Sequence, residues 1–182
     1  MARAPEFETL RDVIVAPATA PGAAAISIVR LSGAGCVALA ESLWAGRGFA
    51  ASGPGIMVLG TLRSAAGNAI DRCLVVHWRA PASYTGEDMV EWHLHGSPVV
   101  VEGAIAAVIA AGARAAQPGE FTRRAFLNGK LDLAQAEAVG LLTASRTEAA
   151  QRTALRQLGG GLSRILDGVR NGLVRVLAEL EA

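Results

Sequence analysis

The sequence predicts an α+β domain followed by an all-α segment. In the first two thirds of the chain, short β-branched runs alternate with helix-like segments, and several connections are too short for a full βαβ crossover. After Pro118-Gly119 the pattern becomes purely helical. We therefore expect a first domain at residues 1–128 and the first helices of an incomplete helical domain at residues 129–182.

Apolar β-branched runs predict the first strands, over Asp12–Pro17 and Ala25–Arg30. Cys36–Trp44 fits a short helix. Gly55–Leu62 and Cys73–Trp78 predict two paired strands joined across a Gly-Asn turn. Together these segments make the first half of the predicted domain mainly β.

Met89–His95 predicts another strand, and Pro98–Ala111 predicts a buried, alanine-rich helix that ends at Gly112. A short basic helix follows Pro118-Gly119. This alternation of strands and helices completes the α+β pattern.

Two capping patterns open the later helices. Asp132 with Gln135 resembles a capping box, and Ser145 with Glu148 predicts the start of the next helix. An apolar stripe with spacings of three and four then runs through Leu155, Leu158, Leu162, Ile165, Val169, Leu173, Val176 and Leu180. Such a stripe needs another helix to cover it, and it is still running where the sequence ends. We expect a helical domain that further protein, or a second chain, completes.

Composition excludes some classes of function. The net charge of +1 argues against a DNA-coating protein, which would need a large positive excess. The two cysteines lack a CxxC spacing, which fits a reducing compartment. Glu6, Glu8 and Asp12 stand where a signal peptide would need an apolar run, and no apolar stretch approaches 18 residues. We therefore expect a soluble, cytoplasmic protein.

Gly33–Ala38 matches G-x-G-x-x-A between a predicted strand and a predicted helix, which is the context of a dinucleotide-binding fingerprint. The acidic residue expected about 20 positions later is missing, because no Asp or Glu lies between Glu41 and Asp71. A plain turn before a helix is therefore the favoured interpretation.

Glu91, His93 and His95 alternate along one predicted strand, so their side chains share one face of the sheet. Three ligands on one face could bind a metal. The same pattern could present a carboxylate to a polar ligand, or the histidines could be structural. The residues alone leave these three alternatives open.

Lys130 is the only lysine, and the other 16 of the 17 basic residues are arginine. It follows Asn128-Gly129 at a junction between predicted helices, where it could bind an anionic group or be a solvated turn residue. No G-x-x-x-x-G-K-[ST] motif is present, so this sequence should not hydrolyse nucleotide by the P-loop route.

Three segments, SIVRLSG, SYTGEDMVEWHLHGSP and PGEFTRRAFLNGKLDLAQAEAV, resemble in order the N-terminal part of the bacterial tRNA modification GTPases of the MnmE (TrmE) family. The resemblance implies a folate-binding domain of aminomethyltransferase-like type that forms a homodimer and holds formyl- or methylene-tetrahydrofolate. In this family a helical domain follows. It is split by a GTPase domain that binds GTP, magnesium and potassium, and it ends in a catalytic cysteine. By resemblance, Cys36 and Cys73 do not have that cysteine's role.

The family's folate-contacting positions fall on Arg30, Glu91 and Lys130. A carboxylate such as Glu91 can accept the adjacent N–H groups of a pterin edge, and two cations can bind polar ring atoms and the glutamate tail of folate. The resemblance assigns no catalytic residue and no metal ligand to this chain. Two segments depart from the family pattern: Ala20–Ala25 replaces a PPGRGG-like segment, and Ser97 replaces the second glycine of HGGP.

The resemblance thus implies the folate-binding, dimerising part of an enzyme that works with a flavin-dependent, MnmG-like partner. The complete enzyme installs a carboxymethylaminomethyl-type group on the tRNA wobble uridine, and tetrahydrofolate supplies a one-carbon unit. This part contributes binding and assembly without GTPase activity of its own. The alternatives are a stand-alone folate-dependent one-carbon transferase, a dimerisation scaffold that binds no folate, and a metal hydrolase using Glu91, His93 and His95.

Overall fold

The computed structural model describes residues 12–181, except for the side chains of residues 162–165 and 167. The chain divides into two compact units, the first ending at Arg124 and the second starting at Ala125. The first unit contains a seven-stranded sheet with helices, and the second is helical. The predicted α+β class followed by a helical segment is confirmed.

The strand order across the sheet is β3-β4-β5-β6-β2-β1-β7. All neighbouring strands pair antiparallel except β1 and β7, which are parallel. The strands are β1 (Ile14–Pro17), β2 (Ala24–Ser32), β3 (Trp44–Ala45), β4 (Val58–Arg63), β5 (Ala69–Trp78), β6 (Met89–Gly96) and β7 (Arg114–Ala115).

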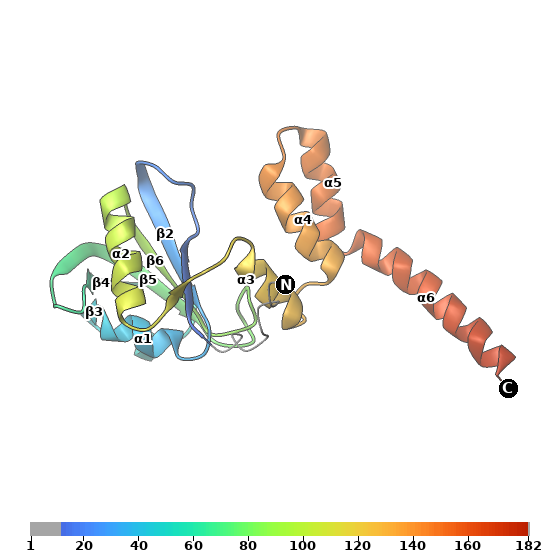
Figure 1. Ribbon diagram of the computed structural model, residues 1–182, viewed down its shortest axis with the longest axis horizontal. Coiled ribbons are helices and arrows are strands. Elements are labelled where there is room, and N and C mark those ends of the chain that lie inside the picture. The colour runs from blue at the N-terminus through green and yellow to red at the C-terminus, as the bar shows by residue number, and fades with distance from the viewer. Residues whose placement is uncertain (1–11, 182) are drawn as a thin grey trace, which may run out of the picture. The chain divides into compact units, whose positions relative to one another are not determined.

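Helix α2 lies along one face of this sheet, where it contacts β1, β2, β5 and β6 (Figure 1). Helix α1 contacts β6 and β3. The helical elements are α1 (Cys36–Ser42), the 3₁₀ turn η2 (Ala50–Ser52), α2 (Pro98–Ala110), α3 (Glu120–Leu127), α4 (Leu133–Ala144), α5 (Glu148–Leu158) and α6 (Gly161–Leu180).

The pleat of β2 and β6 separates the core from the polar residues. Val29, Leu31, Trp92 and Leu94 are almost fully buried in the core cluster that includes residues of α2. Because successive side chains of a strand point to opposite faces, the intervening residues of both strands lie on the other face of the sheet. Glu91, one of the site residues predicted from the sequence, is among them.

The predicted strands and helices of this unit are found, with shifted ends. Strand β5 begins at Ala69, four residues before the predicted start, and α1 ends at Ser42 because Trp44–Ala45 pairs with β4 instead of continuing the helix. Strands β3 and β7 were not predicted, since two residues are too few to give a period.

In the second unit, the capping box of α4 is confirmed. The Asp132 side chain accepts from the Gln135 backbone N–H at 2.8 Å, and the Gln135 side chain accepts from the Asp132 backbone N–H at 2.9 Å. The predicted cap at Ser145 is wrong, because Ser145 ends α4 as its C-cap. Thr147 caps α5 instead, accepting from the Ala150 N–H at 3.2 Å.

The apolar stripe does not run along a single helix, because Gly159 and Gly160 separate α5 from α6. Several apolar residues of α6 are exposed within this unit, including Val169, Leu173 and Leu180. The side chains of Leu162 and Ile165, which also belong to the predicted stripe, lie outside the described residues. No helix of the described chain is long and apolar enough to cross a membrane.

Candidate functional site

Arg30 and Glu91 face each other on neighbouring strands. Arg30 of β2 and Glu91 of β6 are register partners, and Arg30 Nε donates to Glu91 Oε1 at 2.6 Å. The Glu91 side chain is 10% exposed and the Arg30 side chain 27% exposed. The sheet register thus holds a charged pair at a largely buried position that solvent and ligands can still reach.

Two aromatic rings flank the guanidinium of Arg30. Its central carbon lies 5.5 Å from the ring centroid of Tyr84 and 5.8 Å from that of Phe121, distances typical of cation–π contacts. The Tyr84 hydroxyl and the Thr122 hydroxyl share a hydrogen bond of 2.8 Å, which joins the loop before β6 to α3. These contacts fix the plane of the guanidinium beside Glu91.

Several polar groups of this site make no hydrogen bond with described residues. They are the two terminal nitrogens of Arg30, the Oε2 atom of Glu91 and the Nε2 atom of His93. An ionised carboxylate accepts through both oxygens, and a guanidinium has four N–H donors on its terminal nitrogens. We call Arg30, Glu91 and His93 the open polar site. It can bind a planar ligand that carries both donors and acceptors along one edge.

His95 does not join this site. Its Nδ1 atom lies 2.7 Å from Asp71 Oδ1, and its backbone N–H donates to Asp71 Oδ2 at 2.8 Å. The described residues contain no group of three or more His, Cys, Asp or Glu side chains that could hold a metal ion. The alternative of a metal site formed by Glu91, His93 and His95 is therefore not supported.

Lys130 lies in the second unit, directly after α3. Its backbone N–H donates to the Ala125 carbonyl at 2.8 Å, and the Gly129 N–H donates to the Phe126 carbonyl at 3.0 Å. With Gly129 at φ 70°, these bonds form a Schellman motif that leaves Lys130 exposed. The structure brings Arg30 and Glu91 together, whereas the membership of Lys130 in the same site stays a prediction.

A second charged cluster surrounds the buried guanidinium of Arg124, which is 1% exposed. Arg124 donates to Asp12 Oδ1 at 2.7 Å, to Glu87 Oε2 at 3.1 Å and to Glu120 Oε1 at 3.2 Å. The cluster connects the start of the sheet, the loop before β6 and helix α3. That loop and that helix supply the rings that flank Arg30.

Tyr84, Phe121 and the Arg124 cluster were not predicted from the sequence. Tyr84 and Phe121 lie within the motifs SYTGED and PGEFTRR, but nothing in the sequence places them beside Arg30. The charged partners of Arg124 could not be predicted either, because Asp12 lies 112 positions before Arg124.

The glycine-rich segment before α1 has a structural explanation. A Cβ atom on Gly33 would lie 2.4 Å from the Asp12 carbonyl oxygen, so only glycine fits this close approach of two backbones. Helix α1 has only seven residues. The interpretation of this segment as a turn before a helix accounts for its glycines without a dinucleotide.

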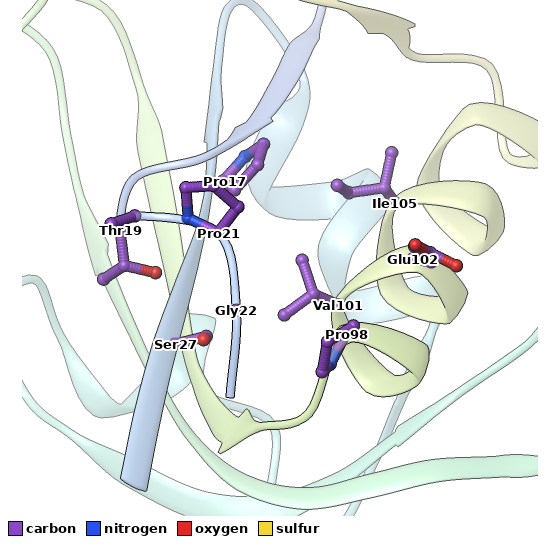
Figure 2. Close-up of a pocket in the computed structure, with 10 residues that line it drawn as sticks. Pro17, Thr19, Pro21, Gly22, Ser27, Pro98, Val101, Glu102 and Ile105 are labelled. Atoms are coloured by element: carbon purple, nitrogen blue, oxygen red, sulfur yellow. The ribbon is translucent and has the colours of Figure 1, made fainter. Parts of the chain in front are cut away.

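The two segments that depart from the family pattern meet at a cavity of about 200 Å³ on the α2 face of the sheet. Figure 2 shows Pro17 and Pro21 on one side of this cavity, with Val101 and Ile105 of α2 on the other. Ala24 and Gly96, which belong to or adjoin the departing segments, are register partners.

The departures are distant from the open polar site. Arg30 follows Ala24 by six positions in β2, which corresponds to about 20 Å along the strand. Ser27 lines the cavity on the α2 face, and Arg30, three residues further, lies on the opposite face. The changes at Ala20–Ala25 and Ser97 therefore do not alter the Arg30–Glu91 pair directly.

Cys36 and Cys73 are both buried free thiols. Burial raises the pKa of Cys36 to about 12, with a smaller contribution from Asp88, and raises the pKa of Cys73 to about 12, with Asp71 contributing. A thiol with so high a pKa is protonated at neutral pH and is a poor nucleophile. Neither cysteine has the properties of a catalytic residue.

The chain matches one protein-family model and is similar to proteins that share one name. Residues 13–130 match the family model described as GTP-binding protein TrmE N-terminus. A tRNA modification GTPase MnmE from Thermus thermophilus is 47% identical over 174 residues, and that from Caulobacter vibrioides is 50% identical over 173. The alignments cover 95% of this chain but only 40% and 38% of the relatives. The chain thus spans about two fifths of the length of the relatives it matches.

Proposed function

The chain belongs to the family of the TrmE N-terminus, and from this premise we propose that it binds a tetrahydrofolate derivative at the open polar site. The relatives are named tRNA modification GTPases, so the bound folate serves tRNA modification. Arg30 and Glu91 hold the pterin ring, and Lys130 binds the folate as a further cation. The bound cofactor, formyl- or methylene-tetrahydrofolate, supplies a one-carbon unit.

The observation that supports this proposal most is the partly satisfied carboxylate of Glu91. The residue is 7% exposed, and its Oε1 atom accepts from Arg30 while Oε2 accepts from no described residue. Oε2 therefore keeps lone pairs that can accept hydrogen bonds from a bound ligand. The pterin edge has a ring N–H beside an amino group, and these two donors match the two oxygens of one carboxylate.

Arg30 serves two purposes in this proposal. Its Nε–H fixes the orientation of the Glu91 carboxylate at 2.6 Å, and its terminal nitrogens stay available to polar ring atoms or to the anionic glutamate tail. The rings of Tyr84 and Phe121 keep the guanidinium in place before the ligand arrives, which reduces the ordering cost of binding.

We assign the homodimer interface to the uncovered part of the same sheet face. Leu59, Leu74, His93 and Ile28 are consecutive register partners across β4, β5, β6 and β2, so they form one row. Leu59 is 53% exposed and Leu74 37% exposed. Adjacent exposed apolar residues of this kind mark association surfaces, and a second copy of the chain would cover them. A Leu59→Glu variant should therefore sediment as a monomer at concentrations where the parent is a dimer.

In the full-length protein, this part binds folate and dimerises while other parts carry the remaining chemistry. The segment shared with the relatives has no P-loop motif, so we assign GTP hydrolysis, with its magnesium and potassium, to a region outside it. The complete enzyme acts in the cytoplasm with a flavin-dependent, MnmG-like partner. Together they modify the wobble uridine of tRNA.

Isothermal titration calorimetry with 5-formyltetrahydrofolate tests the proposal. We expect about one folate per chain, and a Glu91→Gln variant should bind at least tenfold more weakly, because a hydrogen bond to a charged group contributes about 1.5–3 kcal/mol. Lys130→Ala should also weaken binding, and Lys130→Arg should restore part of it because the positive charge is kept.

Glu102→Gln is the matched control, since Glu102 is an exposed carboxylate of α2 that lines the cavity on the opposite sheet face. If this variant lost affinity and Glu91→Gln did not, the folate would be bound in that cavity and the assignment to Arg30 and Glu91 would be wrong. A folded parent that forms a dimer but gives no heat with folate would reduce the chain to an assembly scaffold.

A further inference from the structure

His93 lies beside the Arg30–Glu91 pair and has no assigned role. It follows Glu91 by two residues on β6, so both side chains are on the same face of the sheet. Its register partners are Ile28 and Leu74, two apolar residues that cannot hydrogen-bond its ring. The side chain is 21% exposed, but its Nε2 atom is buried and has no hydrogen-bond partner among the described residues.

The unpaired nitrogen of His93 is next to the unpaired oxygen of Glu91. Nε2 lies 3.7 Å from Glu91 Oε2, which is too long for a hydrogen bond between them. Glu91 Oε1 already accepts from Arg30, so Nε2 and Oε2 are the two neighbouring polar atoms that no described residue satisfies. With the proton on Nε2, the two side chains offer an acceptor and a donor side by side.

This pattern has a specific complement in the pterin ring of folate, which carries an amino group at position 2, an N–H at position 3 and a carbonyl oxygen at position 4. We propose that His93 is the residue that recognises the oxygen at position 4, donating from Nε2 while Glu91 accepts from the neighbouring N–H. This inference rests on the proposed folate site and adds a determinant of ligand specificity to it.

The proposal predicts discrimination against 4-amino analogues of folate. Replacing the oxygen by an amino group turns the acceptor at position 4 into a donor and removes the proton from N3. His93 and Glu91 would then each face a group of the wrong kind, and a binding site built for one hydrogen-bonding pattern rejects its mismatched analogue.

The test measures binding of 5-formyltetrahydrofolate and of its 4-amino-4-deoxy counterpart by calorimetry. We expect the parent to prefer the 4-oxo compound by at least about tenfold, the ratio that one mismatched buried hydrogen bond gives. His93→Leu should weaken binding of the 4-oxo compound about tenfold, leave the 4-amino compound unaffected and so abolish the preference. His93→Gln keeps a donor and should restore part of the preference.

His95→Leu is the matched control, since it removes a histidine of the same strand whose ring is paired with Asp71. It should leave the preference between the two compounds unchanged. A second readout is the ring ¹⁵N spectrum of His93, in which Nε2 should stay protonated and its signal should shift when the 4-oxo compound binds.

The outcomes separate this inference from the proposed function. If the parent bound neither compound, the folate site and the role of His93 would both be wrong. If Glu91→Gln lost folate binding while His93→Leu kept the parent's affinity and preference, the folate site would stand and the role of His93 would be wrong.

Discussion

Arg114 and Glu120 form a two-point ion pair that ties β7 to the start of α3. Arg114 Nη2 donates to Glu120 Oε1 at 2.6 Å, and Nη1 donates to Oε2 at 2.9 Å. Arg114 Nε also donates to Asp12, which belongs to the Arg124 cluster. The hydrogen bonds from Arg114, together with one from the Gln117 backbone N–H, lower the pKa of Glu120 from 4.5 to about 2.

This lowered pKa makes the stability of the first unit sensitive to acid. A carboxylate whose pKa is lower in the folded state stabilises the fold above its unfolded pKa, and loses this effect as the pH falls toward its folded pKa. Lowering the pKa of Glu120 from 4.5 to about 2 corresponds to about 3 kcal/mol at neutral pH. We therefore expect Glu120→Gln to lower the free energy of unfolding by about 1–3 kcal/mol at pH 7. Urea unfolding should show that this difference shrinks between pH 4.5 and pH 2.

Glu102→Gln provides the control for the acid effect, because Glu102 is exposed and has no ion pair among the described side chains. Its unfolding free energy should stay close to that of the parent at both pH values. A Glu120→Gln variant as stable as the parent at pH 7 would show that the ion pair with Arg114 contributes nothing net to the fold.

The start of α5 depends on Thr147, not on Ser145. The Thr147 hydroxyl accepts from the Ala150 N–H, whereas the Ser145 hydroxyl donates to the Leu142 carbonyl at 2.8 Å at the end of α4. Loss of an N-cap side chain costs about 1 kcal/mol, so Thr147→Ala should speed hydrogen exchange in the first turn of α5 by roughly fivefold. Mass spectrometry of peptides covering Glu148–Arg152 measures this. Equal acceleration by Ser145→Ala would contradict the assignment of Thr147 as the cap.

The sequence was sufficient to predict the larger elements because each of them carries a local composition or spacing signal. A β-branched apolar run identified β2, and an Asp-x-x-Gln spacing identified the start of α4. The sequence predicted the cap of α5 at Ser145, whereas the structure has it at Thr147, two residues later. The choice depends on where α4 ends, and Ser145 with ψ 132° ends it.

Only part of the candidate site could be predicted from the sequence. A period of two places Glu91 and His93 on one face, and the structure confirms that they are neighbours. It cannot show that Arg30, 61 residues earlier, is the register partner of Glu91, because pairing between strands depends on the whole sheet. The family resemblance identified both residues as site residues. The contacts of Tyr84 and Phe121 with Arg30 could not be predicted, because they depend on the positions of α3 and of the loop before β6.

Strands β2 and β6 approach each other closely at Ala24 and Gly96, and a register shift separates this pair from the register that joins Arg30 to Glu91. A Cβ atom on Gly96 would lie 2.2 Å from the Ala24 carbonyl oxygen, a distance that requires one strand to move. In contrast, a Cβ atom on Gly103 of α2 would meet Ile70 at 3.6 Å, an ordinary contact.

Substituting alanine at these two glycines should therefore have opposite effects. Gly96→Ala should lower the free energy of unfolding by about 1–3 kcal/mol, because the added methyl group would clash with the Ala24 backbone in a closely packed part of the sheet. Gly103→Ala should leave stability unchanged or raise it by up to about 1 kcal/mol, because alanine is favoured over glycine inside a helix. Urea unfolding of both variants measures the difference. Parent-like stability in Gly96→Ala would show that the strands have more room there than the structure gives them.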